Sequence, residues 1–325
     1  MFKVYDEFTQ LLQVVLGDVN MNLLDHVDRH EKLFITEIFE ETKDNLNTIA
    51  KIYESHGIKV NRPVVHESFS NDIVTPFYMT KGIRNPLSPR DTFIMLGSTL
   101  LETAGYRADM MFEYMYYKNL FTHNWSNGKH KWIKMPSPVY AEELSSKEPI
   151  IDAAQILRLG THIIVSENGA INDLGIKWME QHFNEFTVIR SGKHIQGHID
   201  GQIKIIKPGL IITPHSKNSL PDCFRSWDII TPDDVLQDTA ITNGILFRDD
   251  DVENTFPSCA IMSLNENTVF LYEHYKDSHK EFVDKLEAYG IGIIFVPFKH
   301  QHWFNQGLTC LTLELDRAGD KQNYI

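Results

Sequence analysis

The stretch FVDKLEAYGIGIIFVPF, residues 282–298, contains the unit that decides the fold of this 325-residue chain. Its first half has apolar residues at the spacing of an amphipathic helix, and the helix should end at Gly290, because glycine is favoured just past a helix end. The residues that follow alternate as in a half-buried strand and stop at Pro297. This stretch therefore predicts a helix followed directly by a strand.

The same design recurs along the chain. LNTIAKIYESHGIKVNRP (46–63) has its glycine at Gly57, and LGIKWMEQHFNEFTVIRS (174–191) is a looser copy that lacks the glycine. Copies spread over the whole chain favour pseudo-symmetric α/β modules around a common centre, and hence a single domain over residues 1–325. An ordinary α/β sandwich with coincidental similarity is the alternative. Further short strands are expected in DTFIMLG (91–97), GTHIIVS (160–166), PGLIITP (208–214) and NTVFLYE (267–273).

The composition limits the class of partner. The formal net charge is −13, from 44 acidic and 31 basic side chains. This argues against general binding of nucleic acid or of an anionic membrane, since both need a positive field, and it suits a cationic substrate. No signal-peptide pattern and no apolar run of about 18 residues is present, and none of the three cysteines lies in a CxxC motif. A cytoplasmic protein without a disulfide framework is expected.

Two ionisable residues stand close together in SGKHIQGHIDGQIKIIKPGLIITPH, residues 191–215. His198 and Asp200 are two positions apart, so that on an extended segment both side chains point to the same side. Gly197 and Gly201 flank them and would allow a ligand to approach closely. A histidine and a carboxylate on one face can supply proton transfer and cation binding, although a surface pair is the simpler reading.

Three more candidates stand beside expected strands. Asp91 precedes an apolar strand, where a carboxylate commonly caps a turn, and Asp152 is expected to be buried with Arg158 as its structural partner, because an unpaired buried carboxylate is costly. Cys310, in NQGLTCLTLELDRAGD (305–320), is either one more buried small residue or a nucleophile held at the start of a strand. His300 and His302 lack an acidic or cysteine partner at metal-ligand spacing, so no metal site is predicted.

Taken together, these blocks resemble the amidinotransferase branch of the guanidino-modifying, or pentein, superfamily, related to arginine:glycine amidinotransferase. The pattern PRD…E…R…FEY is more similar to amidinotransferases than to the hydrolytic arginine deiminases. The resemblance implies a five-bladed α/β-propeller with pseudo-fivefold symmetry and an active site at the central axis. The matching blocks are EFTQLLQVVLG (7–17), PRDTFIMLG (89–97), ETAGYRADMMFEY (102–114), DAAQILRLG (152–160), HID (198–200) and GLTCLTLELDRAG (307–319).

The resemblance also implies a role for each candidate. Cys310 matches the family's nucleophile, His198 its general acid/base and Asp152 the carboxylate beside that histidine, while Asp91 and Asp200 match the other carboxylates that bind the guanidinium. The implied reaction moves the amidino group of L-arginine to a primary amine, glycine or a related one, through an amidino-Cys310 intermediate, and releases L-ornithine. It needs no metal or organic cofactor, and a homodimer is expected. A hydrolase that gives citrulline and a non-catalytic, protein-binding pentein are the alternatives.

The chain departs from the family pattern around the non-reacting end of the substrate. Lys217, in PHSKNS (214–219), stands where the family usually has an arginine that holds the donor's carboxylate, and Ser258 is the nearest match to a family serine pair. Lysine is a point charge without the bidentate fork of arginine, so the binding geometry should differ. The glycine-rich run before the nucleophile is thinned to NQGLTC. These differences leave the identity of the acceptor open.

Overall fold

The strands of the chain form small sheets of one repeated design. The computed structural model describes residues 2–104, 110–139, 147–167, 169–192, 195, 197–232, 259, 261–304 and 306–325, and over these residues it has five three-stranded sheets and one two-stranded sheet. In each three-stranded sheet the first strand is antiparallel to the second, and the second is parallel to the third. The molecule is thus a mixed α/β protein, as predicted.

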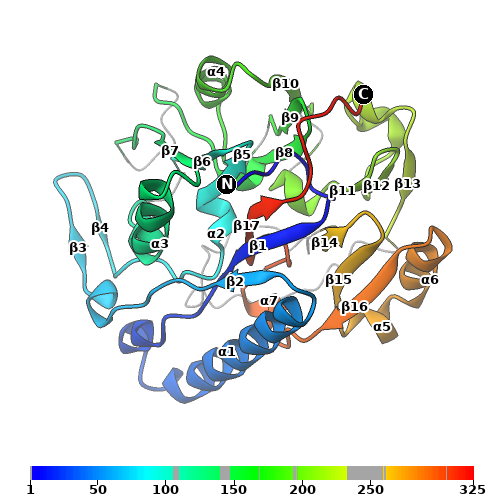
Figure 1. Ribbon diagram of the computed structural model, residues 1–325. Helices are drawn as coiled ribbons and strands as arrows, with labels where there is room; N and C mark the ends of the chain where they lie inside the picture. Colours follow the sequence, from blue (N-terminus) through cyan, green and yellow to red (C-terminus); the bar gives the residue numbers. More distant parts are fainter. Residues whose placement is uncertain are drawn as a thin grey trace.

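The five sheets follow one another around the molecule (Figure 1). One sheet joins the two ends of the chain: its first strand, β17 (Thr312–Arg317), comes from the C-terminal end and pairs with the N-terminal β1 (Leu11–Leu16). The sheets are β5–β6–β7 (Phe93–Leu96, Thr99–Glu102, Lys131–Lys134), β8–β9–β10 (Ile156–Leu159, His162–Val165, Thr187–Arg190), β11–β12–β13 (Lys204–Lys207, Leu210–Ile212, Asp228–Ile230), β14–β15–β16 (Met262–Asn265, Thr268–Tyr272, Gly292–Val296) and β17–β1–β2 (Thr312–Arg317, Leu11–Leu16, Lys59–Asn61).

Helices connect the second strand of a sheet to the parallel third strand, and Figure 1 shows them on the outside of the sheets. In α1 the buried residues recur at the spacing of one helix face, so that this helix packs a mostly apolar stripe inward: Ile35, Ile38, Phe39, Thr42, Leu46, Ile49 and Tyr53. The β12–β13 connection carries only the short turns η6 (Lys217–Ser219) and η7 (Asp222–Phe224). The connecting helices are α1 (Lys32–Ser55), α3 (Tyr114–Ser126), α4 (Asp173–His182), α5 (Tyr275–Ser278) and α6 (Lys280–Ala288).

The helix–strand unit predicted from the sequence is confirmed in all three copies. Helix α6 ends at Ala288 before Gly290 at φ 74°, and α1 ends at Ser55 before Gly57 at φ 76°. Both glycines adopt the left-handed conformation that turns the chain from helix to strand, which explains why the looser copy, without one, has a longer connection between α4 and β10.

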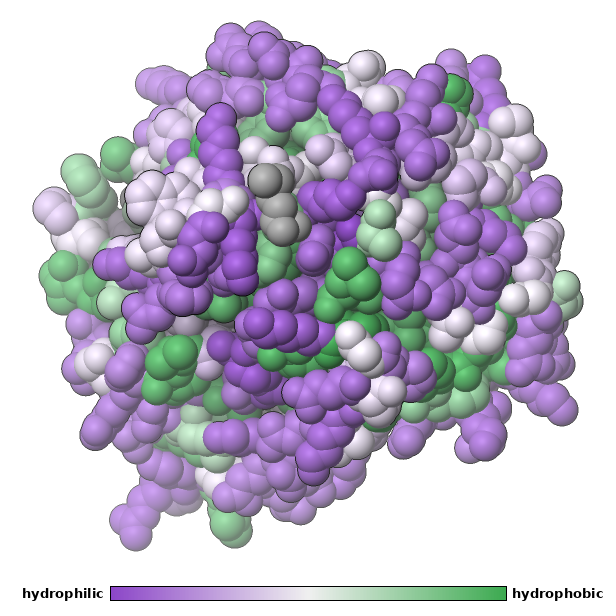
Figure 2. All heavy atoms as spheres, in the orientation of Figure 1, coloured by the Kyte–Doolittle hydropathy of each residue, from purple (hydrophilic) through white to green (hydrophobic). Residues whose placement is uncertain are grey.

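The remaining short elements lie between these units. They are η1 (Met21–His26), η2 (Glu67–Ser70), β3 (Ile73–Val74), β4 (Met79–Thr80), α2 (Pro89–Thr92), η4 (Ala153–Gln155), η5 (Ile199–Gly201) and α7 (Gln301–Phe304). Figure 2 shows a face that is largely hydrophilic, with apolar side chains at the margin where Figure 1 places the β3–β4 hairpin. None of the described helices is both long and apolar enough to cross a membrane.

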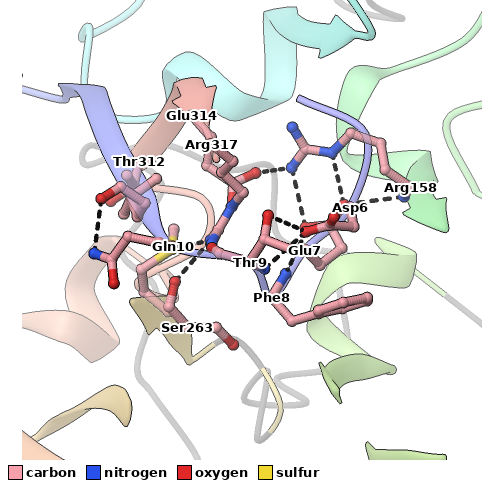
Figure 3. A network of polar contacts seen from close by, with 12 residues as sticks. Asp6, Glu7, Phe8, Thr9, Gln10, Arg158, Ser263, Thr312, Glu314 and Arg317 are labelled. Carbon is pink, nitrogen blue, oxygen red and sulfur yellow. Dashed lines mark hydrogen bonds and ion pairs between the residues drawn. The ribbon is translucent and has the colours of Figure 1, made fainter. Parts of the chain in front are cut away.

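The middle of the molecule is charged rather than apolar (Figure 3). Arg158 on β8 donates from Nε to Oε1 of Glu7 at 2.8 Å and from NH2 to Oε2 of Glu7 at 3.0 Å, and it also pairs with Glu314 on β17. Burial opposes ionisation of Glu7, but the charges of Arg158 and its cationic neighbours lower the pKa of Glu7 to about 2. The Glu7 pair is bidentate, and the Glu314 pair joins β8 to β17, two strands of different sheets.

Candidate active site

Four of the predicted site residues lie in the short segment directly before the first strand of a sheet. Asp91 is in α2, directly before β5, and Asp152 caps η4, directly before β8. Asp200 is in η5, before β11, and Cys310 lies two residues before β17. Because the sheets share one topology, these positions are equivalent, and the short turns meet: α2 contacts η4 and β17, and η4 contacts η5. Residues more than 200 positions apart in the sequence are thus brought to one place.

His198 lies between two of the carboxylates. Its Nδ1 is 3.9 Å from Oδ1 of Asp91, and its Nε2 is 3.6 Å from Oδ2 of Asp152. The imidazole is 17% exposed, whereas the two carboxylates are 3% and 1% exposed, so the histidine faces the more open side of the cluster. Both distances are longer than a good hydrogen bond, so these are ion-pair contacts when the imidazole is protonated.

The carboxylates present buried oxygens without a hydrogen-bond donor. Within the described part of the chain, Oδ1 of Asp91, Oδ2 of Asp152 and both oxygens of Asp200 accept no hydrogen bond. The other oxygen of Asp152 accepts from the backbone N–H of Ala154 at 2.9 Å, which fixes the orientation of the carboxylate. Buried polar atoms are nearly always paired in folded proteins, so a group of unpaired acceptors indicates a site for a ligand with several N–H donors.

Burial raises the pKa values of two of these carboxylates. Burial, together with the negative charge of Asp91, raises the pKa of Asp152 well above its ordinary value. The pKa of Asp200 rises from 3.8 to about 7, again because of burial, although the positive charges of Arg90 and Lys204 oppose the shift. Without a cationic ligand, the cluster therefore holds protons that ordinary aspartates would have lost at neutral pH.

Sequence reasoning missed the group that holds Asp91. Arg84 donates from NH2 to Oδ2 of Asp91 at 3.2 Å, and its Nε pairs with Glu113, which also accepts from the hydroxyl of Thr92. Burial raises the pKa of Glu113 to about 7, while the charge of Arg84 opposes the shift. The one available sequence signal was a glutamate within the aromatic run MMFEYMYY (110–117). Arg84 leaves Oδ1 of Asp91 as the oxygen that faces His198.

Cys310 is buried and belongs to a closed turn. It is 6% exposed, and the backbone N–H of Leu311 donates to the carbonyl of Gly307 at 3.1 Å, so that the turn closes around it. The thiol lies within electrostatic range of the buried Tyr272, at the end of β15. The prediction that Cys310 stands at the start of a strand is confirmed, since β17 begins at Thr312.

Two local predictions are wrong. His198 and Asp200 are not on an extended segment: His198 is the cap of the 3-10 turn η5, which contains Asp200, because Gly197 at φ 74° turns the chain there. Arg158 is not the partner of Asp152, since its guanidinium is engaged by Glu7 and Glu314.

The expected binding residues outside the cluster are less informative. Lys217 lies in η6, after the C-terminal end of β12, and it is exposed. Ser258 lies outside the described residues. Over the residues that are described, no group of three or more His, Cys, Asp or Glu side chains is arranged to hold a metal ion. Cys223, Cys259 and Cys310 all lie within the described residues and form no disulfide with one another.

The fold and the site define a mixed α/β protein in which a histidine lies between buried carboxylates before the first strands of two sheets, and a buried cysteine precedes the first strand of another. No protein-family model matches the chain. It is 26% identical over 299 residues to inosamine-phosphate amidinotransferase 1 of Streptomyces griseus, an alignment that covers 86% of this chain and 82% of that protein. It is 24% identical over 323 residues to the L-arginine:L-lysine amidinotransferase of Pseudomonas savastanoi pv. phaseolicola, covering 92% and 84%. It is also 26% identical over 312 residues to the mitochondrial glycine amidinotransferase of Xenopus laevis, covering 87% and 71%.

Solved structures agree on the fold. The chain superposes on inosamine-phosphate amidinotransferase from Streptomyces griseus with a TM-score of 0.83 at 23% identity, covering 100% of this chain and 99% of that one. A dimethylarginine dimethylaminohydrolase structure matches less well, with a TM-score of 0.62 at 14% identity and coverage of 94% and 100%. The predicted resemblance to amidinotransferases is therefore confirmed by the relatives, and the fold is shared with the solved structures.

Proposed function

We propose that this protein is an amidinotransferase that takes the amidino group of L-arginine onto Cys310 and passes it to a primary amine. One observation carries the proposal: four buried carboxylate oxygens of Asp91, Asp152 and Asp200 have no hydrogen-bond donor and lie in the cluster that includes His198. A guanidinium is planar, cationic and carries five N–H donors, so a cluster of buried carboxylate oxygens that lack a donor is suited to bind it.

The residues divide the chemistry between them. With its plane held by the carboxylates, the guanidinium exposes its central carbon, and the thiolate of Cys310 attacks that carbon to give a tetrahedral adduct. His198 then protonates the departing amine of ornithine as the C–N bond breaks, which leaves an amidino-thioether on Cys310. In the second half-reaction an acceptor amine attacks the same carbon, His198 takes its proton, and the thiolate leaves. Atoms and charges balance over the two steps without a redox or metal co-reactant.

Transfer is favoured over hydrolysis by the relatives. Three relatives that align over most of the chain carry amidinotransferase names, whereas the hydrolase in the comparison resembles the chain in fold alone. Those three names give three different acceptors: an inosamine phosphate, L-lysine and glycine. We propose a primary amine as the acceptor class, with Lys217 and Ser258 binding the non-reacting parts of the substrates.

The architecture of the protein is part of the same proposal. We propose that the five sheets of one topology are the blades of a pseudo-fivefold α/β-propeller, that residues 1–325 form one catalytic domain, and that the protein acts as a homodimer in the cytoplasm. The repeated strand order, the contact of β17 with β5 and the contacts of α2 with η4 and of η4 with η5 support the propeller.

Product analysis tests the function. The protein is incubated with arginine alone and then with glycine, L-lysine or inosamine phosphate, and ornithine, citrulline and guanidino products are quantified. We expect ornithine, and a guanidino product with one of the amines. Cys310→Ala should abolish both, while Cys259→Ala, at another buried cysteine, should not. Citrulline formed without an amine would mean that water is the acceptor and would replace transfer by hydrolysis.

A further inference from the structure

Gln306, four residues before Cys310, makes several buried hydrogen bonds. Its side-chain Oε1 accepts a hydrogen bond from the hydroxyl of Ser88 at 2.7 Å, and its Nε2 donates to the carbonyl of Phe304 at 3.1 Å. The backbone carbonyl of Gln306 accepts a hydrogen bond from the hydroxyl of Tyr272 at 3.2 Å. Ser88, Tyr272 and Gln306 are all buried, at 4%, 3% and 9% exposure, so water does not compete for these bonds.

The Ser88 bond joins this segment to the carboxylate side of the site. Ser88 is the residue directly before α2, the short helix that carries Asp91. The bond spans 218 positions of sequence and connects the turn of one sheet to the segment that precedes the first strand of another. Gln306 is therefore bonded directly to the element that presents a guanidinium-binding carboxylate.

The Tyr272 bond joins the same residue to the surroundings of the thiol. Tyr272 is at the end of β15, and its phenol is close enough to Cys310 for the thiol's charge to raise the pKa of the phenol further, after burial has already raised it. Gly307, the next residue after Gln306, begins the turn that closes around Cys310. A movement of Gln306 would consequently move the start of that turn.

We propose that Gln306 is a positioning residue that sets the distance between the Cys310 thiol and the guanidinium held by Asp91, through its bonds to Ser88 and Tyr272. This inference rests on the proposed function. A more glycine-rich segment would be free to rearrange, whereas the Gln306 bonds fix the thiol before the substrate arrives. Misplacing a nucleophile by about 1 Å can cost on the order of 100-fold in rate, so the effect should fall on the chemical step rather than on binding.

The experiment measures the first half-reaction alone and needs no acceptor. Rapid quenching and intact-protein mass give the rate of amidino adduct formation at several arginine concentrations, for the unmodified protein and for Ser88→Ala, Gln306→Leu and their double variant. We expect each single variant to lower the maximal rate by about 10- to 100-fold, with the half-saturating arginine concentration within about twofold. The double variant should be no slower than the slower single variant, because both remove the same bond.

Gln301→Leu is the matched control. Gln301 is buried at 3% exposure in α7, and its side-chain Oε1 accepts no hydrogen bond from a described residue. Replacing Gln301 with leucine should leave the rate of adduct formation within about twofold of that of the unmodified protein. Ser88→Thr, which keeps the hydroxyl, should recover most of the rate lost in Ser88→Ala. A loss of adduct amplitude at an unchanged rate would indicate partial unfolding and would overturn the positioning role.

A second readout does not depend on the proposed reaction. Alkylation of Cys310 by iodoacetamide, followed by peptide mass, should become more than about threefold faster in Ser88→Ala and Gln306→Leu, because the buried thiol is released from its fixed position. If arginine forms no adduct even on the unmodified protein, the proposed function fails while this arm still decides the inference. Adduct and alkylation rates that stay at the unmodified level in both variants would overturn the inference and leave the proposed function intact.

Discussion

Replacing Asp200 with asparagine should stabilise the protein in the absence of substrate at alkaline pH. Asp200 is 2% exposed, and neither of its carboxylate oxygens accepts a hydrogen bond from a described residue. Above neutral pH its charge is therefore buried and poorly compensated, which costs folding free energy. Asparagine has nearly the same shape and carries no charge, so the variant should lose this cost together with the ability to hold a guanidinium.

The size of the effect follows from the pKa of Asp200. Its value of about 7, against an ordinary 3.8, means that the folded state binds the proton more tightly than the unfolded state does. The unmodified protein therefore loses stability as the pH rises from about 4 to about 7, and no further above that. A pKa difference of about 3 corresponds to about 4 kcal/mol, an upper figure, because water and local relaxation reduce it.

Urea unfolding followed by tryptophan fluorescence measures the free energy of unfolding between pH 5 and pH 8, and the chain has five tryptophans to report it. The advantage of Asp200→Asn should grow with pH up to about 7 and then level off. Asp222→Asn, at a side chain that is 81% exposed, should stay within about 0.5 kcal/mol of the unmodified protein throughout. An advantage that does not change with pH, or a variant less stable at pH 8, would refute the account of a buried, uncompensated carboxylate.

Three further substitutions test other contacts in the structure. Arg84→Met should lower the free energy of unfolding in urea by about 3–5 kcal/mol, because two buried carboxylates lose their partner; a change below about 1 kcal/mol would contradict that pairing. Gly169→Ala should cost about 1–3 kcal/mol and exceed the cost of Gly192→Ala: both have φ 86°, but only at Gly169 would the added Cβ meet a side chain, Nε2 of Gln155 at 3.0 Å. Lys217→Ala should raise the half-saturating arginine concentration about tenfold at an unchanged maximal rate of adduct formation, if Lys217 holds the donor's carboxylate; an unchanged half-saturating concentration would remove it from the site.

The repeated α/β design could be predicted because its signals are local. An apolar stripe, a glycine just past the helix and an alternating strand are all contained within about 18 residues, as in 46–63 and 282–298. The positions of Asp91 and Cys310 directly before a strand were predicted for the same reason. The convergence of those positions was not local, and it came from the resemblance to a known family rather than from any pattern in the chain.

Two of the errors and omissions involve ion pairs that no local pattern marks. Arg158 pairs with Glu7, 151 positions away, and Arg84, which also pairs with Asp91, pairs with Glu113, 29 positions away. No periodicity marks such pairs, because they form only when separate sheets come together. The turn at His198 was misread because a spacing of two residues is equally compatible with a strand and with a 3-10 turn, and only the backbone conformation of Gly197 distinguishes them.

The central claim is a covalent amidino group on Cys310, and peptide mass mapping of the protein quenched during incubation with arginine tests it most directly. We predict one amidino group per chain, located on the peptide that contains Cys310, absent from Cys310→Ala and removed by an acceptor amine. An unmodified Cys310 in a protein that releases ornithine would contradict the mechanism, as would an amidino group on Cys223 or Cys259 instead.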